Sequence, residues 1–247
     1  MKENIDYKDL IPKIEKTKMP LHIAIILDGN GRWAKKHKTK RVNGHREGVK
    51  AVRRIVEIAG EVGLEYLTLY AFSTENWGRS KTEVSYLLKL IMDSLIKEID
   101  ELIKNNVKIK FIGTQEKLDA DYNKQVMETC RKSWNNTGLH LNIAMNYGGR
   151  KEIIDSFKAI TADIQSGKFQ GEITEQVVSD HLYTAGMPDV DLVIRTSGEE
   201  RLSNYLIWQS AYAELWFTKT LWPDFTAEEF IQAILDYQQR RRRFGAR

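Results

Sequence analysis

Short runs of apolar and β-branched residues alternate along this chain with longer segments in which apolar residues recur every three or four positions. The short runs predict strands, and the longer segments predict amphipathic helices. Because regular alternation of the two is typical of parallel sheets with crossover helices, we expect an α/β fold with a central, mostly parallel, six-stranded sheet flanked by helices. The predicted strands cover residues 21–27, 66–72, 107–112, 139–145, 190–194 and 214–217, and the predicted helices cover 45–61, 81–104, 116–134, 150–166, 174–184 and 227–243.

The pattern continues without a linker, a repeat or a low-complexity segment, which indicates a single domain. The 247 residues, 42% of them hydrophobic, are enough for one sizeable core. We place this domain at residues 19–247. Residues 1–18 alternate in charge and lack a sustained apolar pattern, so we expect them to form a charged, loosely held N-terminal segment.

Cysteine usage and hydropathy indicate the compartment. Cys130 is the only cysteine, so no disulfide can form within the chain and no cluster of thiolates can hold a metal. The N-terminal sequence lacks the apolar stretch of a signal peptide, and nowhere do about eighteen apolar residues run together. We therefore expect a cytoplasmic protein that does not span a membrane.

Four of the predicted strands run into loops of similar chemistry. In open α/β sheets, ligands bind beyond the carboxyl ends of the strands, so these loops are candidates for one shared site. Each combines glycine, which permits close backbone approach, with arginine, whose planar fork of donors matches phosphate oxygens. One such loop alone would more often be a turn with a solvated arginine, but four predict a site for more than one phosphate. The loops begin at Asp28, Ser73, Asn146 and Arg195.

An acidic residue opens the first loop, where DGNGR follows the strand. Gly29, Gly31 and Ala34 have the spacing of a dinucleotide fingerprint, but the second strand does not end in the expected ribose-binding acid, and no P-loop motif occurs. Asp28 would repel a bare diphosphate. It would suit a cation shared with the diphosphate, because Mg²⁺ is typically held by one or two carboxylates together with phosphate oxygens.

Charge leaves the identity of the ligand open. The net charge of +4 is modest, and cations gather in RWAKKHKTKRVNGHR and in QQRRRRFGAR. Such runs are usually solvated, although an anionic substrate, a nucleic acid or a phospholipid surface can use them. Two rival hypotheses are a Mg²⁺-dependent nucleotide phosphohydrolase and a nucleic-acid-binding module that uses the basic tail.

A set of motifs identifies a family. DGNGRWAK, GH at Gly44 and His45, LYAFSTENW, NYGGR, DLVIRTSGE, RLSNYLIWQSAYAEL and LWPDF occur in this order between Leu21 and Gly245. In combination they resemble the cis-prenyltransferases, most closely the bacterial undecaprenyl diphosphate synthases. The resemblance implies Mg²⁺-dependent, sequential cis condensation of isopentenyl diphosphate onto an allylic diphosphate, usually farnesyl diphosphate, with release of diphosphate. It also implies that the product is a long polyprenyl diphosphate, undecaprenyl diphosphate, which serves as the carrier lipid for the cell wall.

The resemblance also assigns roles to residues. It makes Asp28, Asn76 and His45 catalytic and gives the Mg²⁺ to Asp28 and Glu214. On residue type alone, His45 would more often be a helix-start or solvent-facing residue than a catalyst. The residues that the resemblance places at the allylic diphosphate are Gly29, Asn30, Gly31, Arg32, Trp33, Arg41, His45, Ser73, Thr74, Glu75, Trp77 and Arg79. Those that it places at the isopentenyl diphosphate are Arg195, Arg201, Ser203, Arg243 and Gly245.

The segment from Val84 to Ile103 carries an apolar stripe wider than a surface helix needs. Core packing explains the stripe, and the resemblance adds a second interpretation, in which this helix walls an apolar tunnel beside the sheet for the growing product. The side chains that fit either role are Leu87, Leu88, Ile91 and Leu95. The resemblance further implies a homodimer, peripheral contact with the inner face of the plasma membrane during product release, and no nucleic-acid partner.

Overall fold

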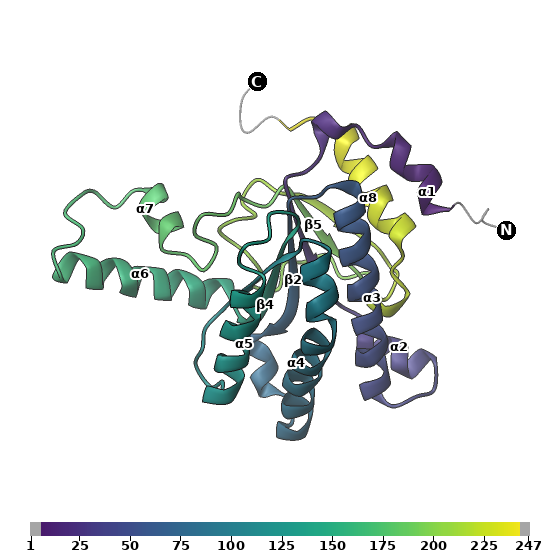
Figure 1. Ribbon diagram of the computed structural model, residues 1–247, viewed down its shortest axis with the longest axis horizontal. Coiled ribbons are helices and arrows are strands. Elements are labelled where there is room, and N and C mark those ends of the chain that lie inside the picture. The colour runs from purple at the N-terminus through teal and green to yellow at the C-terminus, as the bar shows by residue number, and fades with distance from the viewer. Residues whose placement is uncertain (1–5, 243–247) are drawn as a thin grey trace.

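The centre of the molecule is a six-stranded sheet in the order β3-β4-β2-β1-β5-β6, with every neighbouring pair parallel (Figure 1). This computed structural model describes residues 6–242. The expected α/β architecture is confirmed, and the sheet is wholly rather than mostly parallel. The strands are β1 (His22–Ile26), β2 (Tyr66–Ser73), β3 (Lys108–Ile112), β4 (His140–Tyr147), β5 (Leu192–Arg195) and β6 (Glu214–Phe217).

Helices connect these strands, and most of them lie where the apolar periodicity predicts. The side chains of Ser80 and Thr226 accept hydrogen bonds from backbone amides of the first turns of α4 and α8, which fixes where these helices begin. The unexpected element is α2, because DGNGR reads as a glycine turn. The helices are α1 (Tyr7–Leu10), α2 (Asn30–Lys36), α3 (Arg41–Val62), α4 (Lys81–Lys104), α5 (Ala120–Lys132), α6 (Gly149–Gln165), α7 (Glu175–Asp180) and α8 (Ala227–Gln239).

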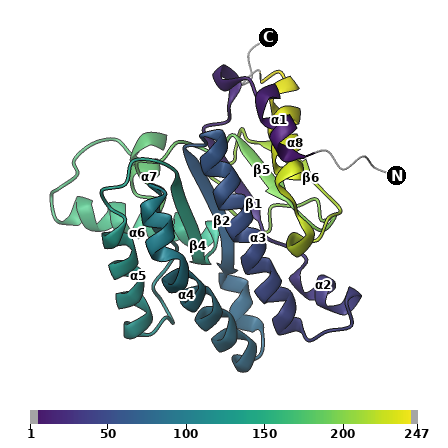
Figure 2. The ribbon, with the colours of Figure 1, turned by 45° about the vertical axis from the view of Figure 1, so that its right-hand side comes forward.

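Both faces of the sheet are buried, as is usual for parallel sheets. Ile23 and Ile25 of β1 point into a large core shared with α3 and α8, whereas Ala24 and Ile26 point to the opposite face. Helices α3, α4 and α8 cover the first face, and α6 and α7 extend to one side of the molecule (Figure 2). None of the helices within residues 6–242 is both long and apolar enough to cross a membrane.

The expectation of a loosely held N-terminal segment is wrong from residue 6 onward. Helix α1 packs on α8, and the side chains of Leu10 and Ile14 are buried in the main core. The backbone amide of Glu15 donates to the side chain of Gln238, whose own amide group donates back to the Glu15 carbonyl. Two apolar residues four positions apart are enough to anchor this short charged segment to the domain.

Strand β1 marks the point where the order of the sheet reverses. From β1 the chain passes to β2 on one side, and it returns later to β5 on the other side. In doubly wound sheets, ligands bind at such a switch point, beyond the carboxyl ends of the strands. Asp28 lies in the loop after β1, and Arg195 is the last residue of β5. The two residues meet at this switch point.

Candidate active site

An ion pair between Asp28 and Arg195 lies at the centre of this switch point. The Asp28 carboxylate is 3.0 Å from Nη2 of Arg195 and 3.2 Å from Nη2 of Arg32. Burial alone would raise the pKa of Asp28, but the two guanidinium groups outweigh burial and hold that pKa below its usual value. Asp28 is therefore an anion at neutral pH, and its partner Arg195 has a side chain only 5% exposed.

Arg195 is held in place by the loop that follows its own strand. Its Nη1 donates to Ser203 Oγ at 2.7 Å and to the backbone carbonyl of Arg201. Ser203 and Asn204 have φ values of 52° and 62°, a left-handed conformation that costs energy in residues other than glycine. Among the described residues, the buried Nε of Arg195 has no hydrogen-bond partner. The loop thus presents a guanidinium group with donor capacity to spare.

A second pair of guanidinium groups meets on Glu199. Arg32 donates to this carboxylate at 2.9 Å and to the backbone carbonyl of Ser197, and Arg201 forms an ion pair with the other carboxylate oxygen. The sequence did not single out Glu199, although its place between Arg195 and Arg201 was a usable signal. Because carboxylates occupy these arginines, an incoming diphosphate can exchange with them without leaving the cations unpaired.

Asn30 is the first residue of α2 and packs closely against α3. A Cβ built on Gly44 would lie 2.0 Å from the Asn30 carbonyl oxygen, and one on Gly48 would lie 2.4 Å from Asn30 Oδ1. Only glycine fits at Gly44, where the obstacle is backbone, whereas at Gly48 a side chain would displace the Asn30 amide; Gly29 before Asn30 needs glycine for its φ of 115°. Asn30 Oδ1 is buried without a hydrogen-bond partner among the described residues. The spacing of Gly44 and Gly48, one helical turn, was a signal for this close packing that the sequence analysis missed.

His45 stands beside Asn30 in the first turns of α3. Burial, reinforced by the nearby positive charges of Arg41 and Arg79, lowers the pKa of His45 to about 4, so the ring is neutral at physiological pH. Its Nε2 is buried and has no partner among the described residues. Arg41 and Arg79 both pair with Glu83, at 3.3 and 3.0 Å. A neutral imidazole beside two arginines can hydrogen-bond an anion without adding charge.

The loop after β2 joins the neighbouring loops. Asn76 caps it, because its side-chain oxygen accepts the amide hydrogen of Ser73. Trp77 donates to Asn146, near the end of β4, at 2.7 Å, and its ring packs edge-on against Phe72. Glu75 accepts from Asn204 in the β5 loop, and Thr74 lies so close to Gly148 that a Cβ there would be 2.5 Å from Thr74 Oγ1. The loops after β2, β4 and β5 therefore form one connected rim.

Two residues named by the sequence analysis lie away from this rim. Glu214 begins β6 and pairs in register with Leu192 at the start of β5, whereas Arg195 ends β5, so Glu214 is at the opposite edge of the sheet from Asp28. There it forms an ion pair with Arg240 at 2.8 Å. The Trp33 ring stacks on His37 and donates to Asp224. The chain thus does not bring Glu214 to Asp28, and Arg243 and Gly245 lie outside the described residues.

An apolar cavity begins at Asn30 and His45 and runs between the sheet and helices α3 and α4. Its volume is about 890 Å³, at the upper end of the usual range for small-molecule sites. Leu87, Ile91 and Leu95 of α4 line it, whereas Leu88 packs with Phe72 in a separate core cluster. Leu87 and Ile91 also belong to that cluster and Leu95 belongs to the main core, so the same side chains of α4 serve both the cavity and the core. The α3 residues that line one wall are spread from His45 to Gly60, 15 positions apart, a length of roughly 22 Å at 1.5 Å per residue.

The donor set at Asp28 suits an ion that arrives with a phosphate ligand. Within residues 6–242, no three His, Cys, Asp or Glu side chains gather closely enough to hold a metal on their own. Mg²⁺, however, commonly binds through one or two carboxylates and completes its shell with phosphate oxygens and water. Asp28 offers one carboxylate that is ionised and 32% exposed, which fits a shared Mg²⁺ and does not fit a permanently bound one.

Comparison with known proteins agrees with this geometry. A family model described as putative undecaprenyl diphosphate synthase matches residues 26–245. An isoprenyl transferase of Clostridium perfringens is 48% identical over 245 residues, which cover 99% of this chain and 96% of that protein. A Micrococcus luteus protein named ditrans,polycis-undecaprenyl-diphosphate synthase, farnesyl-diphosphate specific, is 52% identical over 233 residues, 94% of each chain.

A solved structure shows the same fold. Lavandulyl diphosphate synthase from Lavandula x intermedia, in complex with dimethylallyl diphosphate, matches with a TM-score of 0.89 and 34% sequence identity, over 93% of this chain and all of that one. The family model and the relatives cover nearly the whole chain, and the predicted resemblance is confirmed. The chain therefore belongs to the undecaprenyl diphosphate synthase family and is a prenyltransferase.

Proposed function

We propose that the protein condenses isopentenyl diphosphate repeatedly onto an allylic diphosphate, with farnesyl diphosphate as primer, in a Mg²⁺-dependent cis reaction that releases diphosphate. The observation that carries the proposal is the continuity of two features. A cluster of arginines surrounds Asp28, and Leu27 and Asn30 on either side of it in the chain line an apolar cavity of about 890 Å³. A diphosphate head with a long hydrocarbon tail matches that combination, and the name of the Micrococcus luteus relative supports the primer and an undecaprenyl product.

The allylic diphosphate is assigned to the side of the site next to the cavity. Asn30 and His45 line the cavity mouth, and each has a buried polar atom without a partner among the described residues. Arg32 and Arg41 flank them, with backbone N–H groups at the start of α2. The diphosphate would bind to these groups while its tail enters the cavity, which leaves the allylic carbon facing the β5 loop.

Isopentenyl diphosphate is assigned to the β5 side. Arg195, Arg201 and Ser203 converge there, and Arg195 is already oriented by Ser203. The double bond of this substrate would attack the allylic carbon as the C–O bond to diphosphate breaks, and a proton would then leave the new chain. The reaction needs no covalent nucleophile, and arginines oriented in advance stabilise the charge of the departing diphosphate.

Mg²⁺ would be held by Asp28 together with diphosphate oxygens, and when bound it would neutralise negative charge on the leaving group. Asp28 itself keeps Arg195 and Arg32 in position. Asp28 and Glu214 could share a metal ion only if Glu214 came from another molecule. Within one chain, Glu214 lies at the amino ends of the strands, and Asp28 follows a carboxyl end. Asn76 would act by holding the β2 loop through its bond to Ser73.

The product tail would occupy the cavity. The wall facing it is aliphatic over α3, α4, β2 and β4, with Leu69 and Leu141 on the sheet side. Burying hydrocarbon there is favourable at about 25 cal/mol per Å² removed from water. A product of this kind is suited to the cell-wall carrier lipid, and its delivery implies a cytoplasmic enzyme that contacts the inner face of the plasma membrane.

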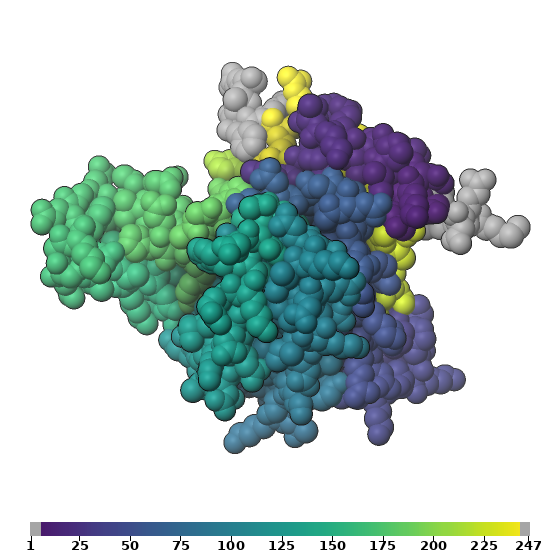
Figure 3. Space-filling model, in the orientation of Figure 1, coloured from purple at the N-terminus to yellow at the C-terminus, as the bar shows by residue number. Residues whose placement is uncertain are grey.

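A homodimer is the assembly that we propose. Helix α6 exposes Ile154 and Phe157, which are 53% and 49% exposed, and the edge strand β6 exposes Leu215. These side chains lie on elements outside the compact centre, and the lobe of α6 and α7 projects from the body in the space-filling view (Figure 3). A two-fold contact would bury such side chains. Light scattering at assay concentration would measure the mass, and a monomer there would contradict this assembly.

The decisive experiment for the function is incubation of the protein with labelled isopentenyl diphosphate and farnesyl diphosphate, followed by sizing of the products. We expect long polyprenyl diphosphates with Mg²⁺ and none with excess EDTA. A parallel incubation with nucleoside triphosphates and with DNA addresses the two rival classes. Phosphate release from a nucleotide, or tight and salt-sensitive binding of DNA without any condensation, would overturn the proposal.

A further inference from the structure

The lateral wall of the apolar cavity is built from two helices that touch weakly. Among residues 6–242, ion pairs join α3 to α4 at only two places. One is Arg41 with Glu83, at the mouth. The other lies deeper, where Arg53 of α3 is 3.2 Å from Glu98 and 2.7 Å from Glu101 of α4. The cavity lies between α3 and α4 in the stretch that separates these two ion-pair sites.

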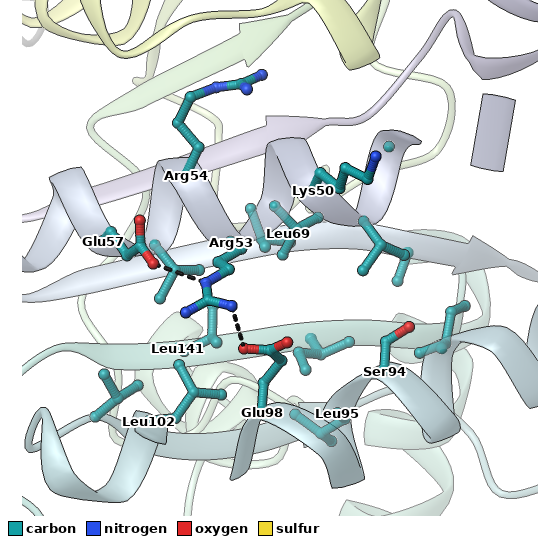
Figure 4. Close-up of a pocket in the computed structure, with 18 of the residues that line it drawn as sticks. Lys50, Arg53, Arg54, Glu57, Leu69, Ser94, Leu95, Glu98, Leu102 and Leu141 are labelled. Carbon is teal, nitrogen blue, oxygen red and sulfur yellow. Dashed lines mark hydrogen bonds and ion pairs between the residues drawn. The ribbon is translucent and has the colours of Figure 1, made fainter. Parts of the chain in front are cut away.

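Arg53 lies over the middle of the cavity. It is 8 residues from His45, or about 12 Å along the helix axis, in a wall that extends to Gly60. Figure 4 shows its guanidinium group reaching from α3 toward Glu98, with Glu57 on its other side and Leu95, Leu102 and Leu141 in the surrounding wall. Nε of Arg53 bonds Glu57 at 2.9 Å, so one residue engages three carboxylates.

The surroundings of Arg53 explain how its ion pairs can set the position of α4 relative to α3. The aliphatic lining of the cavity gives α4 no directional hold on α3, and besides the ion pairs the hydrogen bond from the Tyr86 hydroxyl to the Val42 carbonyl lies near the start of both helices. The Arg53 side chain is 48% exposed and Glu101 is 51% exposed, so water and salt compete for these charges. Each exposed pair contributes little by itself, but Arg53 engages Glu98 and Glu101 together and so favours one spacing of the two helices.

We propose that Arg53 is a positioning residue that fastens α4 to α3 and thereby sets how long the product grows. This inference rests on the proposed function. As the tail lengthens, its tip passes beneath Arg53 into the far half of the cavity, lined by Leu102, Val107 and Leu139. While the ion pairs of Arg53 hold α4 against α3, the tip is confined to that half, and growth stops when this space is full. Without these ion pairs α4 can move away from α3, and the tip gains room between the two helices.

The test is product sizing for Arg53→Ala at saturating substrates and Mg²⁺. We expect a distribution that is broader and longer by one or more isoprene units than that of the parent. Lys89→Ala is the matched control, because Lys89 is an exposed cation on α4 that does not line the cavity. Its products should match those of the parent.

A charge exchange separates the proposed ion pair from a general loosening of the fold. Arg53→Glu combined with Glu98→Arg and Glu101→Arg should restore the parent distribution. If Arg53→Ala fails to fold, the double variant Glu98→Gln and Glu101→Gln breaks the same pair from the other side. Unchanged products in these variants, equal changes in Lys89→Ala, or no rescue by the exchange would overturn the inference. If the parent itself makes no polyprenyl product, the proposed function fails instead.

Discussion

Asp28 and Arg195 are 167 positions apart in the chain, yet their charged groups lie 3.0 Å apart at the adjacent ends of β1 and β5. The carboxylate keeps a buried cation oriented, and the cation keeps the carboxylate ionised. Each partner thus prepares the other for a diphosphate and its metal ion. Four predictions test this arrangement and the parts that support it.

Replacing Asp28 by Asn should lower kcat for condensation by roughly 10²- to 10³-fold, the usual cost of removing one preorganised electrostatic partner. The variant keeps the shape of the side chain and loses its charge toward Arg195. Initial rates at saturating Mg²⁺ measure the effect, and circular dichroism checks the fold. Asp93→Asn, an exposed position on α4, serves as control. Near-normal turnover of the Asp28 variant would refute the role.

Replacing Arg195 by Lys should raise KM for isopentenyl diphosphate about tenfold, equivalent to about 1.4 kcal/mol, with a smaller change for the allylic substrate. Lysine keeps the charge but cannot reach Asp28 and Ser203 at the same time with a planar fork. The measurement is the KM of each substrate at saturation with the other. Equal increases for both substrates would disprove the assignment of two separate sites, and Arg131→Lys, exposed on α5, should change neither.

Gly48→Ala should impair both stability and activity, because the added methyl group would lie 2.4 Å from Asn30 Oδ1. Overpacking of this kind costs about 1–3 kcal/mol, and each kcal/mol lowers Tm by about 2–4 °C in a chain of this size. Gly60→Ala, in the same helix, meets no atom within 4 Å and should be neutral or stabilising by up to about 1 kcal/mol. Thermal melts and condensation rates of both variants test this prediction. Equal changes in Tm and rate for Gly48→Ala and Gly60→Ala would contradict the packing argument.

His45 should make the protein less stable in mild acid. Its pKa is about 4 in the fold and near 6.5 when unfolded, so the unfolded chain binds the additional proton between these values. Stability contributed by the neutral ring is complete above about pH 6.5 and declines as the pH falls toward 4. Urea unfolding at pH 7.5 and 5.5 should show a smaller loss for His45→Gln than for the parent. Equal losses would mean that the ring is not held neutral.

The sequence predicted the elements and the chemistry of their ends well, because both follow from local patterns. The apolar runs of β1 and β2 specify buried strands, and parallel strands bring their carboxyl ends to one edge. This is why the loops at Asp28 and Arg195 could be expected to meet. The resemblance then supplied the family, which the comparisons confirm.

The parts that escaped prediction depend on contacts between distant segments. Glu214 lies at the far edge because it begins β6, as the predicted strand at 214–217 already implied, and the metal role came only from the resemblance. The ion pairs of Glu199 with Arg32 and Arg201 form only when the segments after β1 and β5 lie side by side in the folded chain. Arg53 looked like an ordinary surface cation until α4 was placed opposite it.

The parallel pairing of β1 with β5 also governs when the enzyme becomes competent. During synthesis, β1 emerges early, and one of its edges stays without a neighbour until the polypeptide reaches β5. Parallel pairings between such remote segments form slowly, since a long loop must close first. The proposed site for the second diphosphate is therefore among the last parts of the nascent chain to form, and a fragment that stops before β5 leaves one edge of β1 without a neighbour.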